Sequence, residues 1–193
     1  MSKERLINGV LAMNADDRQQ VRLYYTALWL WNRLDAERWK HAEAALSYAG
    51  RKQSSIEVDH VVSCDLWKTK LAHKVAEKAE ATSLEMGEDL QAKVNEIGNC
   101  MLLQKNFNIS KSNRSLRAFL EGTHEHKKKA WTVDQWGAAL SLAAPQVDSE
   151  STPIEELSAL ITERTQKVRE ELQQFIRGVK VRVDLADAGS AVP

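Results

Sequence analysis

Apolar residues recur at two different spacings along this chain, and each spacing predicts a type of element. Segments 16–34, 65–96 and 154–179 carry apolar residues every third or fourth position, which predicts helices. Two shorter runs, 56–63 and 100–103, are rich in β-branched or other apolar residues and predict strands. We therefore expect a mainly α-helical protein that contains one small pair of strands.

Several of the predicted helices have recognisable ends. The segment 14–17 supplies a cap and early acids for the first helix, and Asp35 is placed to cap a second helix that Gly50 ends. The charged, alanine-rich stretch 65–96 predicts two helices that break near 83–87.

After the second strand, the pattern predicts a loop and then a helix that opens near Asn108 and Ser110, spans 109–120 and ends at Gly122. A further helix is expected to start near Thr132 and to be closed by Pro145.

The last third of the chain predicts a linker and a long helix. Residues 146–153 are rich in Pro, Ser and Asp, which is typical of a flexible linker. Pro153 then opens the 154–179 helix, and its apolar stripe is expected to pack on the core of this chain, although a seam between copies would show the same stripe. Residues 184–193 predict a loose tail.

Composition limits the architecture and the setting. A chain of 193 residues that is 43% hydrophobic can bury one core, so we expect a single domain over residues 1–193. The longest nearly apolar stretches, 24–31 and 136–144, are too short to cross a bilayer, and residues 1–4 do not open a secretion signal. We therefore expect a cytoplasmic protein without a membrane partner.

The two cysteines, Cys64 and Cys100, form no Cys-x-x-Cys pair, so no structural zinc is expected. Reduced thiols, buried or half-buried, are the simpler interpretation. A redox-sensitive pair is the alternative, because both cysteines lie next to the predicted strands.

Charge is balanced overall but not locally. The formal net charge is zero, which argues against a protein that coats DNA by bulk electrostatics. Between positions 105 and 129, however, the chain contains seven basic residues and only two acidic ones. This surplus predicts either contacts with a nucleic-acid backbone or only a solvated helical face.

Candidate chemistry gathers around the two predicted strands. Asp59 and His60 end the first strand, Asn99 precedes the second, and Asn108 follows it. Imidazole is a suitable general base near neutral pH, and carboxylate and amide oxygens are the ligands that Mg²⁺ prefers. Neighbouring strand residues point to opposite faces, so Asp59 and His60 serve one site only if the strand stops or twists there.

This order of strand, strand and helix resembles the HNH, or ββα-metal, nucleases. The run Ile-Gly-Asn-x-x-Leu-Leu at 97–103, followed by Asn108 and by Ser-Asn-Arg-Ser-Leu at 112–116, resembles the nuclease part of GmrSD-type modification-dependent restriction enzymes over residues 54–120. The chain departs from that family at 61–63, where a Pro is frequent, and at 100–101, where Leu-Thr is usual.

The resemblance implies a ββα-metal motif at 53–122, with a helical insertion at 65–96, embedded in a helical domain between a helical lead-in (1–52) and C-terminal helices (123–183). It implies a metal-dependent DNA endonuclease, expected to nick one strand, that acts in restriction or anti-phage defence. The expected roles are general base for His60, a brace for Asn99, ligands of Mg²⁺ or Mn²⁺ for Asp59 and Asn108, and DNA-backbone contacts for Lys111 and Arg114.

In such proteins the nuclease module usually follows a nucleotide-hydrolysing sensor domain. We therefore expect this chain to be the C-terminal part of a larger protein, or the partner of a separate sensor subunit. A catalytically silent HNH-like module that binds nucleic acid or protein is the main alternative, and a helical scaffold without a nucleic-acid role is a third.

Overall fold

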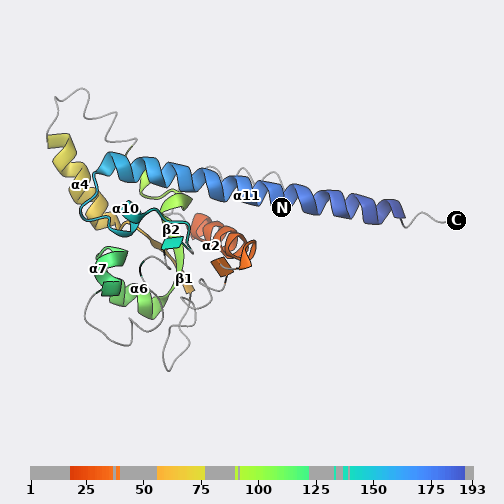
Figure 1. Ribbon diagram of the computed structural model, residues 1–193, viewed down its shortest axis with the longest axis horizontal. Helices are drawn as coiled ribbons and strands as arrows, with labels where there is room; N and C mark the ends of the chain where they lie inside the picture. Colours follow the sequence, from red (N-terminus) through yellow and green to blue (C-terminus); the bar gives the residue numbers. More distant parts are fainter. Residues whose placement is uncertain are drawn as a thin grey trace.

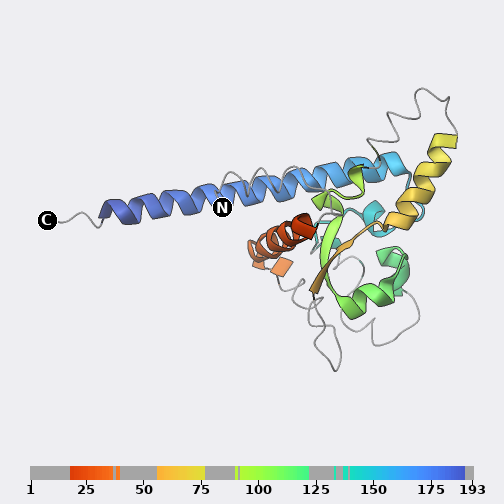
Figure 2. The same ribbon diagram turned by 180° about the vertical axis from the view of Figure 1, so that it is seen from behind.

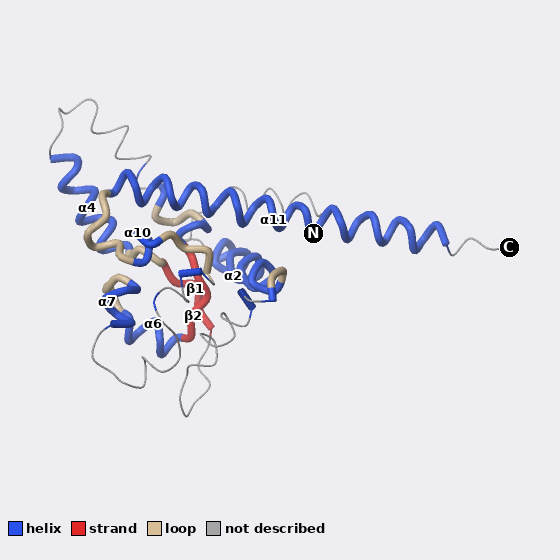
Figure 3. Tube along the Cα trace, viewed as in Figure 1, coloured by secondary structure: helices blue, strands red, loops and turns tan. Residues whose placement is uncertain are grey.

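The structure is a computed structural model, and it describes residues 18–36, 38–39, 56–76, 90, 92–121, 133, 137–138 and 140–189. Most of these residues are helical, and they surround one two-stranded antiparallel sheet (Figure 3). The mainly α-helical architecture with a small pair of strands is thus confirmed. The elements in chain order are α2 (Arg18–Arg33), β1 (Ile56–His60), α4 (Cys64–Ala76), the 3₁₀ turn η1 (Ile97–Asn99), β2 (Cys100–Gln104), α6 (Lys105–Lys111), α7 (Leu116–Glu121), α10 (Ala144–Val147) and α11 (Ile154–Gly189).

Both predicted strands form, and they pair with each other. Ile56 lies opposite Gln104, and His60 lies opposite Cys100. The pairing continues one residue beyond β1, because the Val61 amide donates to the Asn99 carbonyl at 2.7 Å. The strand β1 itself ends at His60, where the sequence predicts the Asp59-His60 pair to end it.

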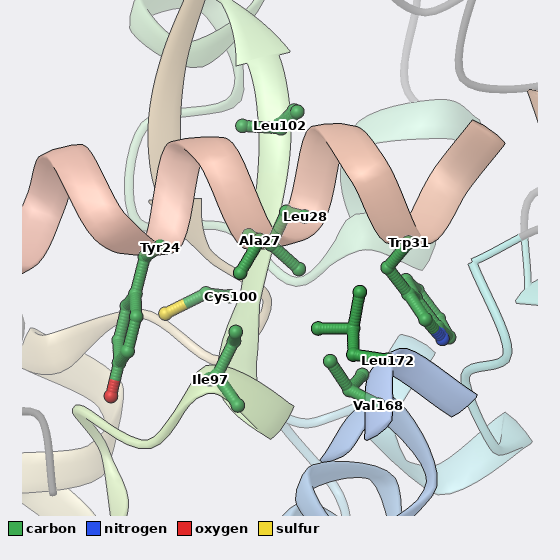
Figure 4. Close-up of a cluster of buried hydrophobic side chains, with 9 residues drawn as sticks. All are labelled: Tyr24, Ala27, Leu28, Trp31, Ile97, Cys100, Leu102, Val168 and Leu172. Atoms are coloured by element: carbon green, nitrogen blue, oxygen red, sulfur yellow. The ribbon is translucent and has the colours of Figure 1, made fainter. Parts of the chain in front are cut away.

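One face of the sheet is covered by α2 and α11. Figure 4 shows side chains of α2, η1, β2 and α11 meeting in one buried cluster, formed by Tyr24, Ala27, Leu28, Trp31, Ile97, Cys100, Leu102, Val168 and Leu172. Trp31 is fully buried there, which agrees with a core role for this tryptophan.

The other face of the sheet packs against α7, α10 and the segment before α10. Side chains alternate along a strand, so Met101 and Leu103 point away from the face that holds Cys100 and Leu102. The buried cluster on this side contains Val61, Met101, Leu103, Leu116, Phe119, Leu140, Leu142 and Val147.

Helix α11 packs on the chain's own core from Ile154 to Leu172. Ile154, Leu157 and Ile161 pack with Trp67 of α4 in a third buried cluster. Farther along, Phe175 and Val179 are 40% and 38% exposed. Figures 1 and 2 both show α11 running past the sheet and extending well beyond the body of the protein.

Helix α11 is also longer than predicted. Positions 184–189 belong to α11, whereas the sequence predicts a loose tail from 184; positions 190–193 lie outside the described residues. Alanine and leucine are strong helix formers, and extending an existing helix needs no new nucleation. Along the described part of the chain, no helix combines the length and the apolar character needed to span a bilayer.

The single helix predicted at 109–120 is wrong. Helix α6 starts at Lys105, directly after β2, so the predicted loop is missing. Ser112 then adopts a left-handed backbone with φ 51°, which ends α6. Ser115 starts α7 by accepting a hydrogen bond from the Ala118 amide at 3.0 Å, as an N-cap does.

Two predictions around Pro145 also need correction. Pro145 lies in the first turn of α10 and does not close a helix, because Ser141, with φ 49°, already turns the chain before it. The segment 146–153 is not a loose linker: Gln146, Ser149 and Thr152 are buried. The Thr152 hydroxyl lies 3.1 Å from the Pro145 carbonyl and 3.0 Å from the Asp148 carbonyl, so local bonds hold this turn.

Other predicted boundaries are only partly described. Asp35 accepts the Arg38 amide at 2.7 Å, as expected for a cap, but most of the second helix that it would open lies outside the described residues. The predicted break at 83–87 lies outside them as well.

Arg164 and Gly98 fix η1 onto α11. The Arg164 guanidinium is buried and donates to the carbonyls of Gly98 (2.7 Å), Cys100 (2.9 Å) and Leu140 (2.9 Å). Burial lowers the pKa of Arg164 to about 10, so the guanidinium stays charged at neutral pH. Gly98 lies so close to α11 that an added Cβ would be 2.0 Å from the Ile161 carbonyl oxygen.

Gly98→Ala is expected to destabilise the protein by about 3 kcal/mol, because backbone atoms of α11 cannot make way for the methyl group. The measurement is urea unfolding followed by circular dichroism. Gly178→Ala is the matched control, since nothing lies within 4 Å of the Cβ it would add, and it should not lower stability. Equal behaviour of the two variants would contradict this packing.

Candidate functional site

His60 lies at the end of β1 with its ring held between two side chains. Its Nε2 is 3.1 Å from Asn95 Oδ1, and its Nδ1 is 3.5 Å from Cys64 Sγ. With the Asn95 oxygen as acceptor, Nε2 carries the proton, and Nδ1 is the acceptor nitrogen of the neutral ring. His60 is half-buried, and these two contacts fix the orientation of its ring.

Asn99 braces the turn that follows His60. Its Oδ1 accepts the Val62 amide at 2.9 Å, and its Nδ2 donates to the carbonyls of Val62 (3.0 Å) and Val94 (2.8 Å). The side chain is fully buried. Asn99 therefore links the chain after His60 to the segment that carries Asn95. Asn95 in turn orients the His60 ring. Whether this brace serves catalysis stays a prediction.

Asp59 points to the other side of β1, toward α6. Its Oδ2 lies 3.1 Å from Lys111 Nζ, and the side chain is only 15% exposed. Burial raises the pKa of Asp59 above its ordinary 3.8, and the positive charge of Lys111 offsets only part of this effect. Asp59 and His60 are thus adjacent in the chain but contact different elements.

Lys111 does not occupy the place predicted for it. The sequence assigns it a surface contact with DNA phosphates, whereas its side chain is 1% exposed and its ammonium is paired with Asp59. The reason is the early start of α6: a helix that begins at Lys105 carries its last residue, Lys111, back over the end of β1.

Asn108 contacts a residue that the sequence analysis did not single out. Its Nδ2 lies 3.4 Å from Glu57 Oε2, a long hydrogen bond. Glu57 is two positions before Asp59 and therefore shares its face of β1. The alternation of side chains along β1 is the sequence signal that could have identified Glu57. It places this second carboxylate on the side of β1 that faces α6. Asn95, the partner of His60, carries no comparable signal, because it lies in a turn before η1.

A divalent cation would find suitable donors on this side of β1. Asp59 Oδ2 is buried and lies 3.1 Å from Lys111 Nζ, and Asn108 turns its amide nitrogen to Glu57. One carboxylate and one amide oxygen suit Mg²⁺ or Mn²⁺, which keep several water ligands. The described residues contain no group of three or more His, Cys, Asp or Glu arranged to hold an ion, so they form no cage of protein ligands alone.

Arg114 lies on the surface at the end of α6. Its guanidinium donates to the carbonyls of Ser110 (2.5 Å) and Lys111 (3.3 Å) and lies 5.1 Å from the centre of the Phe119 ring. Arg114 thus closes the C-terminal end of α6, where a positive charge is favourable.

The basic surplus counted from the sequence is reduced in the described part of the chain. Lys111 is paired with Asp59, and Arg117 is paired with Glu121 at 2.9 Å. Positions 127–129 lie outside the described residues. Among the described basic residues of this stretch, Lys105 and Arg114 are exposed.

Both cysteines lie beside His60, as expected, and neither is in a disulfide. Cys64 is half-buried at the start of α4, whereas Cys100 is fully buried opposite His60. Burial raises the pKa of the Cys100 thiol to about 12, which makes it a poor nucleophile.

No family model matches this chain, and neither a curated protein nor a solved structure shows significant similarity to it. The resemblance to HNH nucleases therefore rests on the sequence motifs alone.

Asn99→Ala is expected to lower the unfolding free energy by about 2–4 kcal/mol, because the Val62 amide and two buried carbonyls lose their partner. Chemical unfolding provides the measurement. Asn113→Ala is the control: Asn113 is exposed, and its side chain bonds only to exposed Asp65, so the loss should stay below about 1 kcal/mol. A similar small loss for both variants would contradict the bracing role.

Asp59 should make stability depend on pH in a defined direction. The pKa of Asp59 is higher in the folded state than its ordinary 3.8, so ionising this carboxyl group costs stability. The stability contributed by the protonated carboxyl is therefore fully present below pH 3.8 and is lost as the pH rises through the folded-state pKa. The unfolding free energy of the wild type minus that of Asp59→Asn should therefore fall from pH 3.8 upward and then level off. A difference that rises over this range would show that the attraction to Lys111 outweighs burial.

Proposed function

We propose that this chain is a metal-dependent DNA endonuclease of the ββα-metal type that nicks one strand. The observation that carries the proposal is the double clamp behind His60: both amide atoms of Asn99 bind Val62, while Asn95 orients the imidazole. This clamp fixes the imidazole at the end of β1, while the buried Asp59 carboxylate, one residue earlier, lies on the other side of β1 beside α6.

In the proposed reaction, His60 acts as general base. Its Nδ1, once it no longer contacts the Cys64 thiol that lies 3.5 Å away, takes a proton from a water molecule that attacks a backbone phosphate in line with the leaving oxygen. The proton on Nε2 stays on that nitrogen and is donated to the Asn95 Oδ1, which holds the ring in the required tautomer as it becomes positively charged. Because the orientation of the ring is fixed, His60 stays in position to take the proton while the water molecule attacks the phosphate.

Asp59 and Asn108 would hold the metal ion, and Arg114 would contact the DNA backbone from the exposed end of α6. When bound, Mg²⁺ or Mn²⁺ supplies positive charge to the phosphate and to the leaving oxygen. One such unit carries one general base, which supports cutting of a single strand.

The setting follows from the same resemblance. The proposed partners are DNA and a nucleotide-hydrolysing sensor, either as a preceding domain or as a separate subunit, in restriction or anti-phage defence in the cytoplasm.

One observation favours a second function, a catalytically silent module that binds nucleic acid or protein. The Lys111 ammonium already neutralises Asp59, which is the carboxylate that the metal would need. A module in which Lys111 occupies the metal site would keep the fold of the motif but would not bind the metal ion.

A plasmid-nicking assay with Mg²⁺ or Mn²⁺ tests the proposal. Wild-type protein should convert supercoiled plasmid to the open circle, and His60→Ala should be slower by about 10²–10⁴-fold, which is the usual contribution of a general base. His73→Ala is the control, because His73 is exposed on α4 and should not affect the rate.

If the wild type leaves the plasmid supercoiled with either metal but still shifts DNA in a gel, the silent module is the correct function. Protein that neither cuts nor shifts DNA would be a helical scaffold.

A further inference from the structure

Lys111 has surroundings that are unusual for a lysine. Lysine side chains are rarely fully buried, and those that are buried are paired. The side chain of Lys111 is only 1% exposed. Its Nζ lies 3.1 Å from Asp59 Oδ2, 3.3 Å from the His60 carbonyl oxygen and 3.4 Å from the Ser112 carbonyl oxygen. Three oxygens, one of them charged, thus surround a single positive charge.

The backbone shapes this oxygen site. Lys111 is the last residue of α6, and the left-handed turn at Ser112 ends the helix immediately after it. The His60 carbonyl comes from the end of β1, one residue beyond Asp59. The ammonium therefore links the C-terminal end of α6 to the end of β1, at the position where a hard cation would find oxygen ligands.

We propose that the Lys111 ammonium is the resident cation of this site, and that a divalent ion binds Asp59 only in competition with it. The inference rests on the proposed metal site and adds what controls its occupancy. An ion that approaches Asp59 meets a positive charge held 3.1 Å from the same carboxylate oxygen, in surroundings that screen charge poorly. The affinity for divalent ions is consequently set by Lys111.

Lys111→Met tests the proposal, because methionine keeps most of the side-chain length without the charge. Mn²⁺ binding is measured by isothermal titration calorimetry without DNA, so the result does not depend on cleavage. Removal of a like charge so close to the ion should tighten Mn²⁺ binding by about tenfold or more. Lys105→Met is the matched control: Lys105 is exposed on the same helix, and its loss should leave the affinity unchanged within about twofold.

A second measurement covers the possibility that Lys111→Met is unstable. Its buried Asp59 carboxylate lacks a counter-charge, so Mn²⁺ should raise the melting temperature of Lys111→Met more than that of the wild type. Adding Asp59→Asn to Lys111→Met should abolish this gain. Lys111→Gln, which keeps a hydrogen-bond donor without a charge, should behave like Lys111→Met.

Equal or weaker Mn²⁺ binding by Lys111→Met, or a melting temperature that Mn²⁺ raises no more than in the wild type, would overturn the competition and leave the proposed nuclease activity intact. Absence of Mn²⁺ binding in the wild type and in all variants would overturn the metal site itself, and with it the metal-dependent reaction.

Discussion

The buried guanidinium of Arg164 is the contact on which the rest of this structure depends. It donates to the carbonyls of Gly98 in η1, Cys100 at the start of β2 and Leu140 before α10, so a single side chain joins α11 to two segments that are distant from it in the sequence. Gly98 permits this approach, because any side chain there would collide with α11. A fully buried charge is costly unless its donors are used, and two of the three nitrogens of this guanidinium are matched to carbonyls.

The candidate site is built outward from that contact. Once η1 is fixed, the Asn99 side chain next to Gly98 can reach both Val62 and Val94. These bonds set the path of the chain after His60 and place Asn95 beside its ring. The geometry of the base is therefore determined by packing between α11 and η1, several residues away from the proposed chemistry.

The two polar residues at the end of β1 belong to different surroundings, and this separation defines the electrostatics of the site. His60 lies beside Asn95 and Cys64, where its ring is oriented and half-buried. Asp59 lies beside Lys111, where burial raises its pKa despite the neighbouring ammonium. The His60 ring is thus positioned by hydrogen bonds, and the Asp59 carboxylate is separately balanced by a counter-charge.

The sequence by itself determined both strands, the longer helices and the order of the polar residues. Apolar periodicity predicted α2, most of α11 and both strands, but it missed the start of α6 and the short helix α10. The Asp59-His60 pair appeared where β1 ends because strand signals and turn signals are local. The position of Asn99 at the turn was predictable for the same reason.

Tertiary structure alone decided which side chains meet. No local pattern shows that α6 starts at Lys105 and carries Lys111 inward, that Asn95 turns its oxygen to His60, or that Arg164 crosses to η1. These contacts join segments that are distant in the chain, and burial of both partners selects them. Periodicity reports which face of an element is apolar, but it does not report which element that face will meet.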